Sequence, residues 1–485
     1  MRIFMLGWEF PPFISGGLGT ACYGLTKALS EGGHHVTFVL PKTVDSDYTS
    51  HVKLLSPQAP SPRYEAGPDG ETADDAEQRP AEQVASRFAM DTPTLPGEAE
   101  DAFENVDFRA VPSRLSNPYD AGAGVGQVAV PPAQRGIGFI TPHADYTTET
   151  ERRQQAATPG RPGGGPGPAK SEVPTQESFG GGDLMVEAQR YAQLCVALAS
   201  AEDFDVIHAH DWFTFPAGMA VARATGKPLV VHVHSTEFDR SGDHAHQVIY
   251  QIERDGTQAA ARVIAVSRRT KLVLTERYGV DAEKIEVVYN GVLNGPTRPD
   301  IKIPPKIDKD DKIVLFLGRV TMQKGPEYFI QAAKRVLEKM QEVKFVVAGT
   351  GDKIQEMIEM VAQAGIGHKV VFTGFLRGSD VERVFKMADV YVMPSVSEPF
   401  GIAPLEAISH DVPVIMSKQS GVSEVIEHAL KVDFWDTDEM ANKIIAVLRH
   451  PPLGATLREH ADLEVRRLTW SGAAEKCAAV YGQLV

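Results

Sequence analysis

The sequence predicts an α/β protein with two doubly wound, Rossmann-like domains in series that face each other across a cleft. Short β-branched runs alternate with amphipathic stretches in both halves of the chain, which is the pattern of βαβ units and parallel sheets. A polar, proline-rich stretch at residues 293–312 separates the halves and reads as a linker. Ligands of such sheets bind at the carboxyl ends of the strands.

Length and charge limit the possible function. The chain has 485 residues and a net charge of −15, with 49 basic and 64 acidic residues. A chain of this length is expected to form two or three domains. Its net negative charge argues against a protein that coats nucleic acid or an anionic membrane. No apolar stretch approaches the ~20 residues that span a bilayer. We expect a cytoplasmic protein without a nucleic-acid partner or an integral membrane segment.

The cysteines and the amino-terminal residues support this expectation. Cys22, Cys195 and Cys477 lie far apart and form no CxxC pair, so neither a disulfide framework nor a zinc module is indicated. The first apolar run is too short for a signal peptide.

Residues 56–180 differ in composition from the rest of the chain. They hold 17 of the 33 prolines and carry 19 acidic and 10 basic residues, a net charge of −9. Such a segment buries too little apolar surface to offset its ordering entropy. We interpret it as a low-complexity, partly disordered insertion, with a possible strand and turn between Phe103 and Tyr119.

The strands expected in the two halves are short and β-branched. In the first half they are 2–6, 36–40, 206–209, 229–233 and 263–266, with helical periodicity at 20–31 and 183–199. In the second half they are 313–317, 345–348, 370–373, 390–393 and 414–416.

A glycine-rich loop follows the first predicted strand. It runs from Glu9 to Gly19 and reads EFPPFISGGLG, with the paired glycines at Gly16 and Gly17. Glycines let backbone N–H groups approach a diphosphate, and the amino end of the next helix adds a favourable dipole. The same glycines also suit a tight strand-to-helix turn. GGLG is not the GxGxxG dinucleotide fingerprint, so both interpretations stay open.

A basic loop follows the first strand of the second half and reads GRVTMQKG, from Gly318 to Gly325. Arg319 offers a planar fork for phosphate oxygens, and Lys324 offers a compact point charge. Solvated loops often carry two cations as well. The place at the carboxyl end of a parallel strand favours the phosphate interpretation.

Two glutamates flank the sequence PFG after the strand predicted at 390–393. Glu398 and Glu406 are eight residues apart in SEPFGIAPLE. If a helix begins near Gly401, Glu398 lies in the loop that faces the cleft, and Glu406 lies about one turn into the helix, where it can bind a ribose. Chance often supplies two glutamates at this spacing, but the strand-loop-helix setting favours a site.

Two histidine-rich segments each end a predicted strand, HAHDW at 208–212 and HVHSTE at 232–237. Histidine and aspartate can bind zinc, but no cysteine or HExxH helix accompanies them, so sugar hydrogen bonding or a structural role is favoured over a metal. His234 is the better candidate for contact with a substrate. His208 and His232 are expected to be packed, and His244 and His246 to lie in loops.

Together these motifs resemble the retaining nucleotide-sugar glycosyltransferases of GT-B fold, in particular the group that holds glycogen and starch synthases, sucrose synthases and glycosyltransferase family 4. The resemblance also includes AVS at 265–267 and YNGV at 289–292. It covers nearly everything outside the insertion. Several motifs in the same order are far more specific than any one of them.

The resemblance implies roles for the candidate residues. Arg319 and Lys324 would hold the leaving diphosphate, Glu398 the donor sugar's hydroxyls, and His234 the sugar; we group these four as catalytic. The nucleotide-sugar-binding set comprises Gly16, Gly17, Gly318, Phe400, Gly401 and Glu406, with Glu406 on the ribose. Family members transfer with retention and use no obvious nucleophile, so a front-face attack is implied. Fixed cations and N–H groups suit such chemistry, and no cofactor or essential metal is expected.

The resemblance also implies the domain roles. Residues 1–292, with the insertion at 56–180, would form the acceptor-side domain, and 293–465 the nucleotide-sugar-binding domain. Residues 466–485 would form a last helix that crosses back onto the first domain.

The donor and acceptor remain open. Bacterial glycogen synthases carry Lys-Thr before the paired glycines, where this chain has Ile14 and Ser15. ADP-glucose is therefore in doubt, and UDP-glucose, GDP-mannose or another ADP-, UDP- or GDP-sugar is possible. HAHDW favours α-glucosyl transfer to a carbohydrate, possibly an α-glucan. The alternatives are a different donor with a small acceptor, an epimerase, or a nucleotide-sugar-binding or scaffolding protein without transfer.

Overall fold

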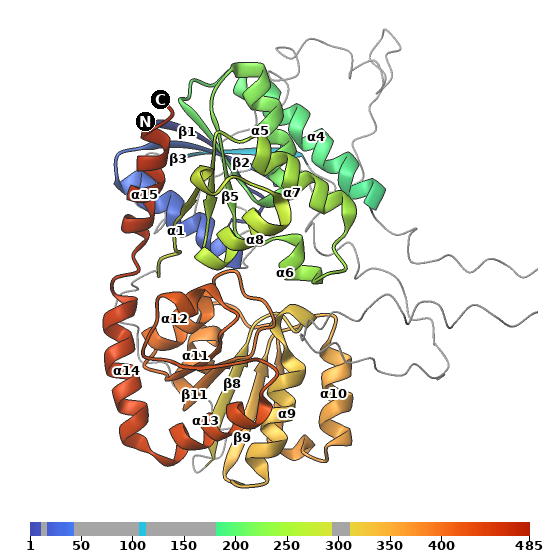
Figure 1. The fold of residues 1–485 in the computed structure, drawn as a ribbon, viewed down its shortest axis with the longest axis vertical. Helices are drawn as coiled ribbons and strands as arrows, with labels where there is room; N and C mark the ends of the chain where they lie inside the picture. Colours follow the sequence, from blue (N-terminus) through green and yellow to red (C-terminus); the bar gives the residue numbers. More distant parts are fainter. Residues whose placement is uncertain (11–16, 43–105, 113–180, 293–310) are drawn as a thin grey trace, which may run out of the picture. The chain divides into compact units, whose positions relative to one another are not determined.

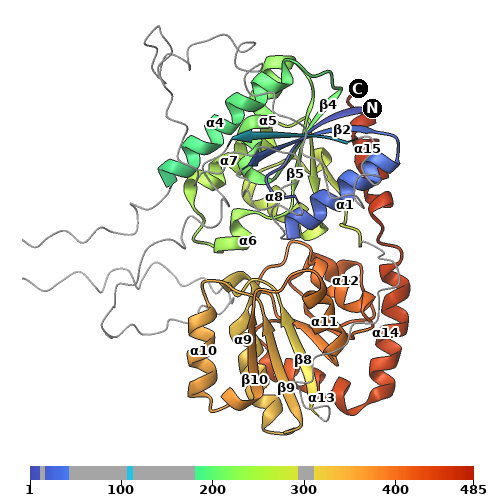
Figure 2. The ribbon, with the colours of Figure 1, turned by 180° about the vertical axis from the view of Figure 1, so that it is seen from behind.

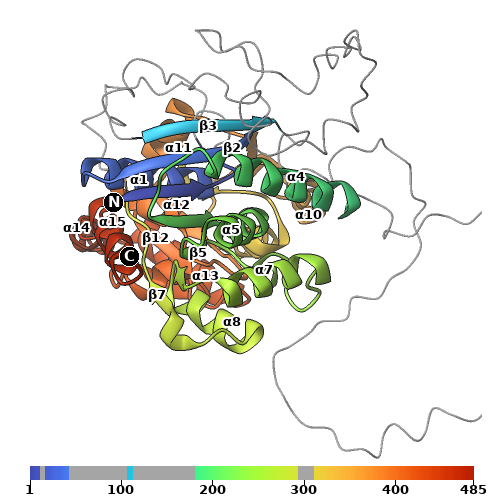
Figure 3. The same ribbon diagram turned by 90° about the horizontal axis from the view of Figure 1, so that it is seen from above.

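The computed structural model describes residues 1–10, 17–42, 106–112, 181–292 and 311–485. The first half contributes the strands β1 (Arg2–Leu6), β2 (His35–Lys42), β3 (Val106–Pro112), β4 (Val206–His210), β5 (Leu229–Val233), β6 (Arg262–Ala265) and β7 (Ile285–Val287). They form one parallel sheet in the order β3-β2-β1-β4-β5-β6-β7. Figure 3 shows β3 beside β2 at its edge.

The second half contributes β8 (Lys312–Leu317), β9 (Val343–Ala348), β10 (Val370–Gly374), β11 (Val390–Met393), β12 (Val414–Ser417) and β13 (Leu430–Val432). They form a second parallel sheet in the order β10-β9-β8-β11-β12-β13. Figure 1 labels β8, β9 and β11 of this sheet. The predicted fold class, two Rossmann-like α/β domains, is confirmed.

The helices of the first half are α1 (Gly17–Glu31), α4 (Gly181–Ala199), α5 (Asp211–Thr225), α6 (Glu237–Ser241), α7 (Gln247–Ala259), α8 (Arg268–Tyr278) and the 3-10 turn η4 (Ala282–Lys284). Those of the second half are η5 (Met322–Lys324), α9 (Pro326–Leu337), α10 (Ile354–Gln363), η6 (Gly367–Lys369), α11 (Ser379–Met387), α12 (Ile402–Ser409), η7 (Gly421–Glu424), α13 (Thr437–Arg449), α14 (Pro451–Val465) and α15 (Trp470–Gly482). No helix in the described part of the chain is long and apolar enough to cross a membrane.

All ten predicted strands are present, and their ends shift by at most two residues. The prediction omitted β7 and β13, which have three residues each, too few for a period-two pattern to be recognised. It named β3 only as a possible strand. Helix α1 begins at Gly17 rather than Thr20, so Gly17 and Gly19 belong to its first turn. Gly16, the linker up to residue 310 and the insertion apart from β3 lie outside the described residues.

The second sheet is buried on both faces because successive side chains of its strands point in opposite directions. Val314 and Phe316 of β8 join a core with α9, α10 and α13. Ile313 and Leu315 join a second core with α11, α12 and α14. The loops at the carboxyl ends of these strands are therefore anchored in two apolar layers.

Helix α15 packs against α1 beside the first sheet (Figures 1 and 2). Trp470, at its start, is 6% exposed and fills the space over Gly24, where an added Cβ would lie 2.2 Å from the Trp470 ring. Toward its end, Tyr481 is fully buried in the same core. Burial of such large side chains contributes about 1.5–3 kcal/mol each, so the last helix is an integral part of the first domain's core.

The amino end of α1 is capped by a side chain from the preceding loop. Oε2 of Glu9 accepts a hydrogen bond from the Gly19 N–H at 2.9 Å. Glu9 is 7% exposed, and burial raises the pKa of its carboxyl to about 7, although the Gly19 N–H and the Arg319 guanidinium favour the charged form. Burial thus opposes the negative charge on Glu9, although the helix dipole favours a negative charge at the amino end of a helix.

We expect Gly24→Ala to destabilise the protein. The new methyl group collides with the Trp470 ring, and overpacking of a core typically costs about 1–3 kcal/mol. Gly482→Ala in α15 is the control, because no atom lies within 4 Å of a Cβ added there. Urea unfolding should show a lower midpoint for Gly24→Ala alone; equal midpoints for the two variants would contradict the packing.

We also expect Glu9→Gln to change how stability depends on pH. Between about pH 4.5 and 7 the folded protein keeps a proton on Glu9 that the unfolded chain releases, so the wild type loses stability as the pH rises through this window. Glutamine does not titrate. The unfolding free energy of Glu9→Gln relative to wild type should therefore rise by a few kcal/mol across the window and level off above pH 7. A difference that stays constant with pH would refute the raised pKa.

Candidate functional site

The loop between β8 and α9 is packed tightly against the loop that follows β11. The Gln323 carbonyl accepts hydrogen bonds from the backbone N–H groups of Val396 at 2.9 Å and Ser397 at 3.4 Å. Gly325 has φ 61°, and a Cβ there would lie 2.3 Å from the Pro394 carbonyl oxygen. Only glycine fits this conformation and this contact. The two loops therefore form one unit at the carboxyl edge of the second sheet.

Lys324 and Glu398 join these loops through an ion pair. The Lys324 Nζ lies 2.5 Å from Glu398 Oε2, and the Ser395 hydroxyl donates to the same oxygen at 3.2 Å. The lysine side chain is 22% exposed and the glutamate side chain 8%. An ammonium group has three N–H donors, so Lys324 can hold Glu398 and still donate to an anion.

Arg319 lies in the same loop, directly after Gly318, and its side chain is exposed. Its Nη2 donates to the Gln323 side chain at 3.5 Å. Its charge also favours ionisation of Glu9, which caps α1. This electrostatic coupling relates the basic loop of the second sheet to the amino end of α1.

The start of α12 carries three of the predicted site residues. Phe400 and Gly401 directly precede the helix, and Glu406 lies within it. Phe400 is 3% exposed and lies 6.0 Å from the Tyr289 ring. Gly401 caps the helix with φ 104°. Glu406 is the fifth residue of α12 and half-buried. Burial, together with the carboxylates of Glu398 and Glu406, raises the pKa of the nearby Tyr391. Both glutamates thus act on one side chain of β11.

His234 follows β5 at the carboxyl edge of the first sheet. Its backbone N–H donates to Asp211 Oδ1 at 2.6 Å, and its ring Nε2 lies 2.9 Å from His210 Nδ1. Asp211 has φ 58°, a left-handed conformation that few residues other than glycine adopt. Its buried carboxyl has a pKa raised to about 7 by desolvation. His234 is therefore held through both its backbone and its ring.

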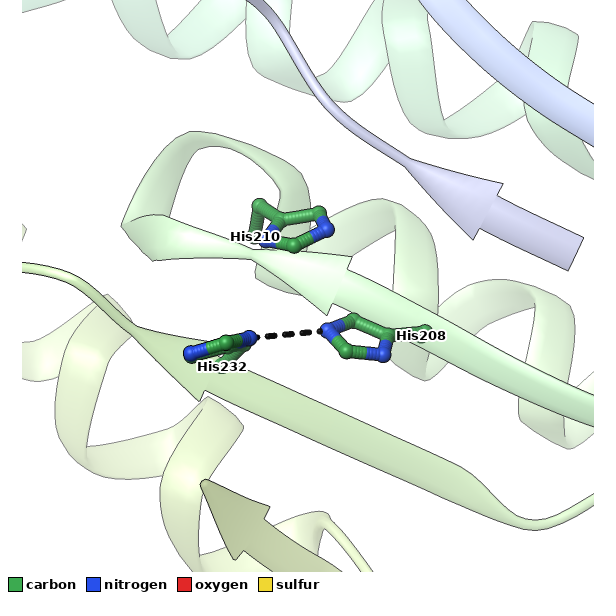
Figure 4. Close-up of side chains that lie close together, drawn as sticks. All are labelled: His208, His210 and His232. Carbon is green, nitrogen blue, oxygen red and sulfur yellow. Dashed lines mark hydrogen bonds between the residues drawn. The ribbon is translucent and has the colours of Figure 1, made fainter. Parts of the chain in front are cut away.

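Three histidine side chains, His208, His210 and His232, lie close enough together to be considered as metal ligands. Figure 4 shows them with the hydrogen bond between His208 Nε2 and His232 Nδ1, at 3.3 Å. The other ring nitrogen of His208 is hydrogen bonded to the Tyr481 hydroxyl. A metal would have to displace one of these bonds. His208 and His232 are packed, as predicted from their place on the strands.

Hydrogen bonds link the loop after β11 to the first half of the chain. The Ser397 hydroxyl donates to Asp239 Oδ1 at 2.6 Å and accepts from Arg269 Nη2 at 3.2 Å. Glu424 accepts from the backbone N–H groups at the start of α8, those of Arg268 at 2.9 Å and Arg269 at 2.8 Å. Charge at a helix end thus connects the two halves.

The structure brings several of the predicted site residues together at the carboxyl edge of the second sheet. Lys324 and Glu398 are in direct contact. Their two loops also carry Gly318, Arg319, Phe400 and Gly401, and Glu406 lies in the helix α12 that follows. Gly17 lies at the start of α1, and Gly16 lies outside the described residues. His234 is hydrogen bonded to His210 through its ring and to Asp211 through its backbone, and its ring stacks on that of His232.

The predicted site residues did not include Glu9, Asp211 or Gln323. Their roles are to cap α1, to hold the His234 backbone and to join two loops. Glu9 lies in the glycine-rich loop motif and Asp211 in the HAHDW motif. Their places in these motifs could have identified both as site residues. Gln323 acts through its backbone carbonyl, which no sequence motif reports.

Comparison with known protein families identifies three matching segments. Residues 2–81 match the starch synthase catalytic domain, residues 158–292 match glycosyltransferase family 4, and residues 297–463 match the glycosyl transferases group 1. An uncharacterized glycosyltransferase of Methanocaldococcus jannaschii is 33% identical over 302 residues, which cover 59% of this chain and 77% of that protein.

Solved structures share the fold. Sucrose-phosphate synthase from Thermosynechococcus elongatus superposes with a TM-score of 0.66 at 17% identity, covering 100% of this chain and 98% of the other. Anabaena HepE, solved in complex with UDP and glucose, gives a TM-score of 0.58 at 16% identity and covers 100% of both chains. The two parallel sheets have the fold of these structures, and one third of the aligned residues are identical to those of a glycosyltransferase. The chain therefore belongs to the glycosyltransferases and has the GT-B fold.

Proposed function

We propose that the protein is a retaining hexosyltransferase that moves an α-glucosyl group from a nucleoside-diphosphate sugar to a carbohydrate acceptor. The observation that carries this proposal is the Lys324–Glu398 ion pair at the carboxyl ends of β8 and β11. Lys324 suits the diphosphate, and Glu398 suits the hydroxyl groups of the sugar. This one ion pair therefore offers a contact to each of the two groups that separate when the sugar–phosphate bond breaks.

The chemistry follows from the charges. When the sugar–phosphate bond breaks, negative charge develops on the departing diphosphate, and preorganised cations stabilise it. Lys324 is held by Glu398, and Arg319 in the same loop is exposed. The acceptor hydroxyl attacks the anomeric carbon on the face that the diphosphate leaves, and its proton passes to a phosphate oxygen. This step needs no protein base and no metal.

The sugar and nucleotide have separate candidate contacts. The Lys324 ammonium and the Ser395 hydroxyl both donate to Oε2 of Glu398, so Oε1 is assigned to accept from a sugar hydroxyl. Glu406, in α12, is assigned to the ribose hydroxyls, and Phe400 and Gly401 to the nucleotide-sugar. Gly16 and Gly17 are assigned to the phosphates and His234 to the sugar.

UDP-glucose is the first donor to test. The Ile14-Ser15 sequence departs from the Lys-Thr of bacterial glycogen synthases, and the structurally similar HepE was solved with UDP and glucose. The match of residues 2–81 to the starch synthase domain supports a carbohydrate acceptor, possibly an α-glucan. A related transferase with GDP-mannose and a small acceptor is the second candidate. A protein that binds nucleotide-sugars without transferring them is the third.

We expect transfer with retention in the presence of EDTA. Thermal shift with UDP-, ADP- and GDP-sugars selects the donor, because a ligand of the folded state raises the melting temperature. The selected donor is then incubated with maltose or glycogen in excess EDTA, and NMR reads the anomeric configuration of the product. An α-linked product is expected. A β-linked product contradicts retention, activity restored only by Mg²⁺ contradicts the metal-free step, and binding without transfer favours the third candidate.

We expect Lys324→Ala to lower kcat by at least about 100-fold, the effect of removing one preorganised group that stabilises developing charge. The matched control is Lys443→Ala, because Lys443 also forms a 2.5 Å ion pair, with Glu439 on the exposed surface of α13. Both variants should keep the circular dichroism spectrum of the wild type. Near-normal turnover by folded Lys324→Ala would overturn the assignment.

A further inference from the structure

Four histidines of the first sheet form a compact block. His208 and His210 lie on β4, His232 on β5 and His234 directly after it. Within each pair the rings stack, with centroids 4.4 Å apart for His208 and His210 and 4.2 Å apart for His232 and His234. Two hydrogen bonds cross between the strands, one from the His208 ring to the His232 ring and one from the His210 ring to the His234 ring.

The rings of the block are neutral near pH 7. Burial lowers the pKa of His208 and of His234 to about 3, and burial together with the neighbouring histidines lowers the pKa of His210 and His232 well below the usual value. A neutral imidazole has one N–H donor and one lone pair. Each ring therefore exists as one of two tautomers, and each bond between rings has one donor and one acceptor.

Each hydrogen bond between rings belongs to a short chain of hydrogen-bonded side chains. The buried end of each chain decides which ring donates and which accepts. His210 Nε2 and His232 Nε2 are buried and have no hydrogen-bond partner among the residues that the structure describes. A buried N–H without a partner is rarer than a buried lone pair without one. The proton of His210 is therefore on Nδ1, from which it donates to His234 Nε2.

We propose that His210 is a positioning residue that fixes His234 as its Nδ1–H tautomer, so that His234 offers an N–H donor to an oxygen of the transferred sugar. The inference rests on the proposed function for the role of the sugar, but the tautomer itself does not depend on it.

The same proton accounting applies to the second chain. His232 carries its proton on Nδ1 and donates to His208 Nε2. The His208 proton is then on Nδ1, from which it donates to the Tyr481 hydroxyl oxygen. Each chain thus has a lone pair rather than an N–H at its buried end without a partner, His210 Nε2 in one and His232 Nε2 in the other. Every ring has a single assigned tautomer.

The backbone of His234 is fixed by the residue next to His210. Asp211 Oδ1 accepts from the His234 N–H at 2.6 Å and from the Ser235 N–H at 3.3 Å. Consecutive residues of the HAHDW motif therefore hold the ring and the main chain of one histidine. With both its ring and its backbone held, His234 can point its remaining ring N–H in only one direction.

The test uses two substitutions of His210 that differ only in where the amide group lies. In His210→Asn the amide N–H₂ takes the place of Nδ1 and can still donate to His234. In His210→Gln the amide reaches the place of Nε2, so the bond to His234 is lost. The tautomer of His234 is read from ¹⁵N NMR of ring-labelled histidines, assigned by the signal that disappears in His234→Asn. Steady-state kinetics with the selected donor is measured in parallel.

We expect His234 to be protonated on Nδ1 in the wild type and in His210→Asn, and to be a mixture of tautomers in His210→Gln. The kcat of His210→Gln should fall about tenfold, the effect of one lost hydrogen bond, while that of His210→Asn stays within about threefold of the wild type. Protonation of His234 on Nε2 in the wild type overturns the inference, and so do equal tautomers in the two variants. The wild-type tautomer is read without the His210 variants and without activity, so misfolding of those variants leaves the inference testable. Failure of the proposed function appears separately as lack of transfer.

Discussion

The packing of Trp470 over Gly24 is the contact on which the placement of the histidine block and of the amino end of α1 depends. It holds α15 against α1, and the two helices share a core that includes the fully buried Tyr481. Tyr481 is bonded to His208 at one end of the histidine block, and α1 presents its amino end to Glu9. Contacts between distant parts of the sequence thus determine the placement of groups at the sheet's carboxyl edge.

The second domain holds a buried carboxylate and its cationic partner in place at the carboxyl edge of its sheet. Buried carboxylates are costly unless they have partners, and Glu398 has both Lys324 and Ser395. The loops that carry these groups are joined by backbone hydrogen bonds and close glycine contacts. Under the proposed function, these rigid loops hold the Lys324 cation beside the diphosphate, so little reorganisation is needed during reaction.

The sequence predicted the two parallel sheets because their strands are short apolar runs bounded by loops, as in Val390–Met393. It also placed Lys324 and Glu398 at strand ends, where parallel topology brings them near each other. It could not predict that α1 begins at Gly17, because the cap comes from Glu9 across the intervening residues. Nor could it predict the protonation of the histidines, which depends on partners from β4, β5 and α15 together.

Asp211 shows how such a site limits the protein's evolution. Its left-handed backbone conformation, with φ 58°, is one that glycine adopts at lower cost. Glycine would relieve this strain but would remove the carboxylate that accepts from His234 and Ser235. Selection for stability and selection for a fixed His234 therefore oppose each other at this one position, and a change that relieves the backbone strain here releases the His234 backbone at the carboxyl edge of the first sheet.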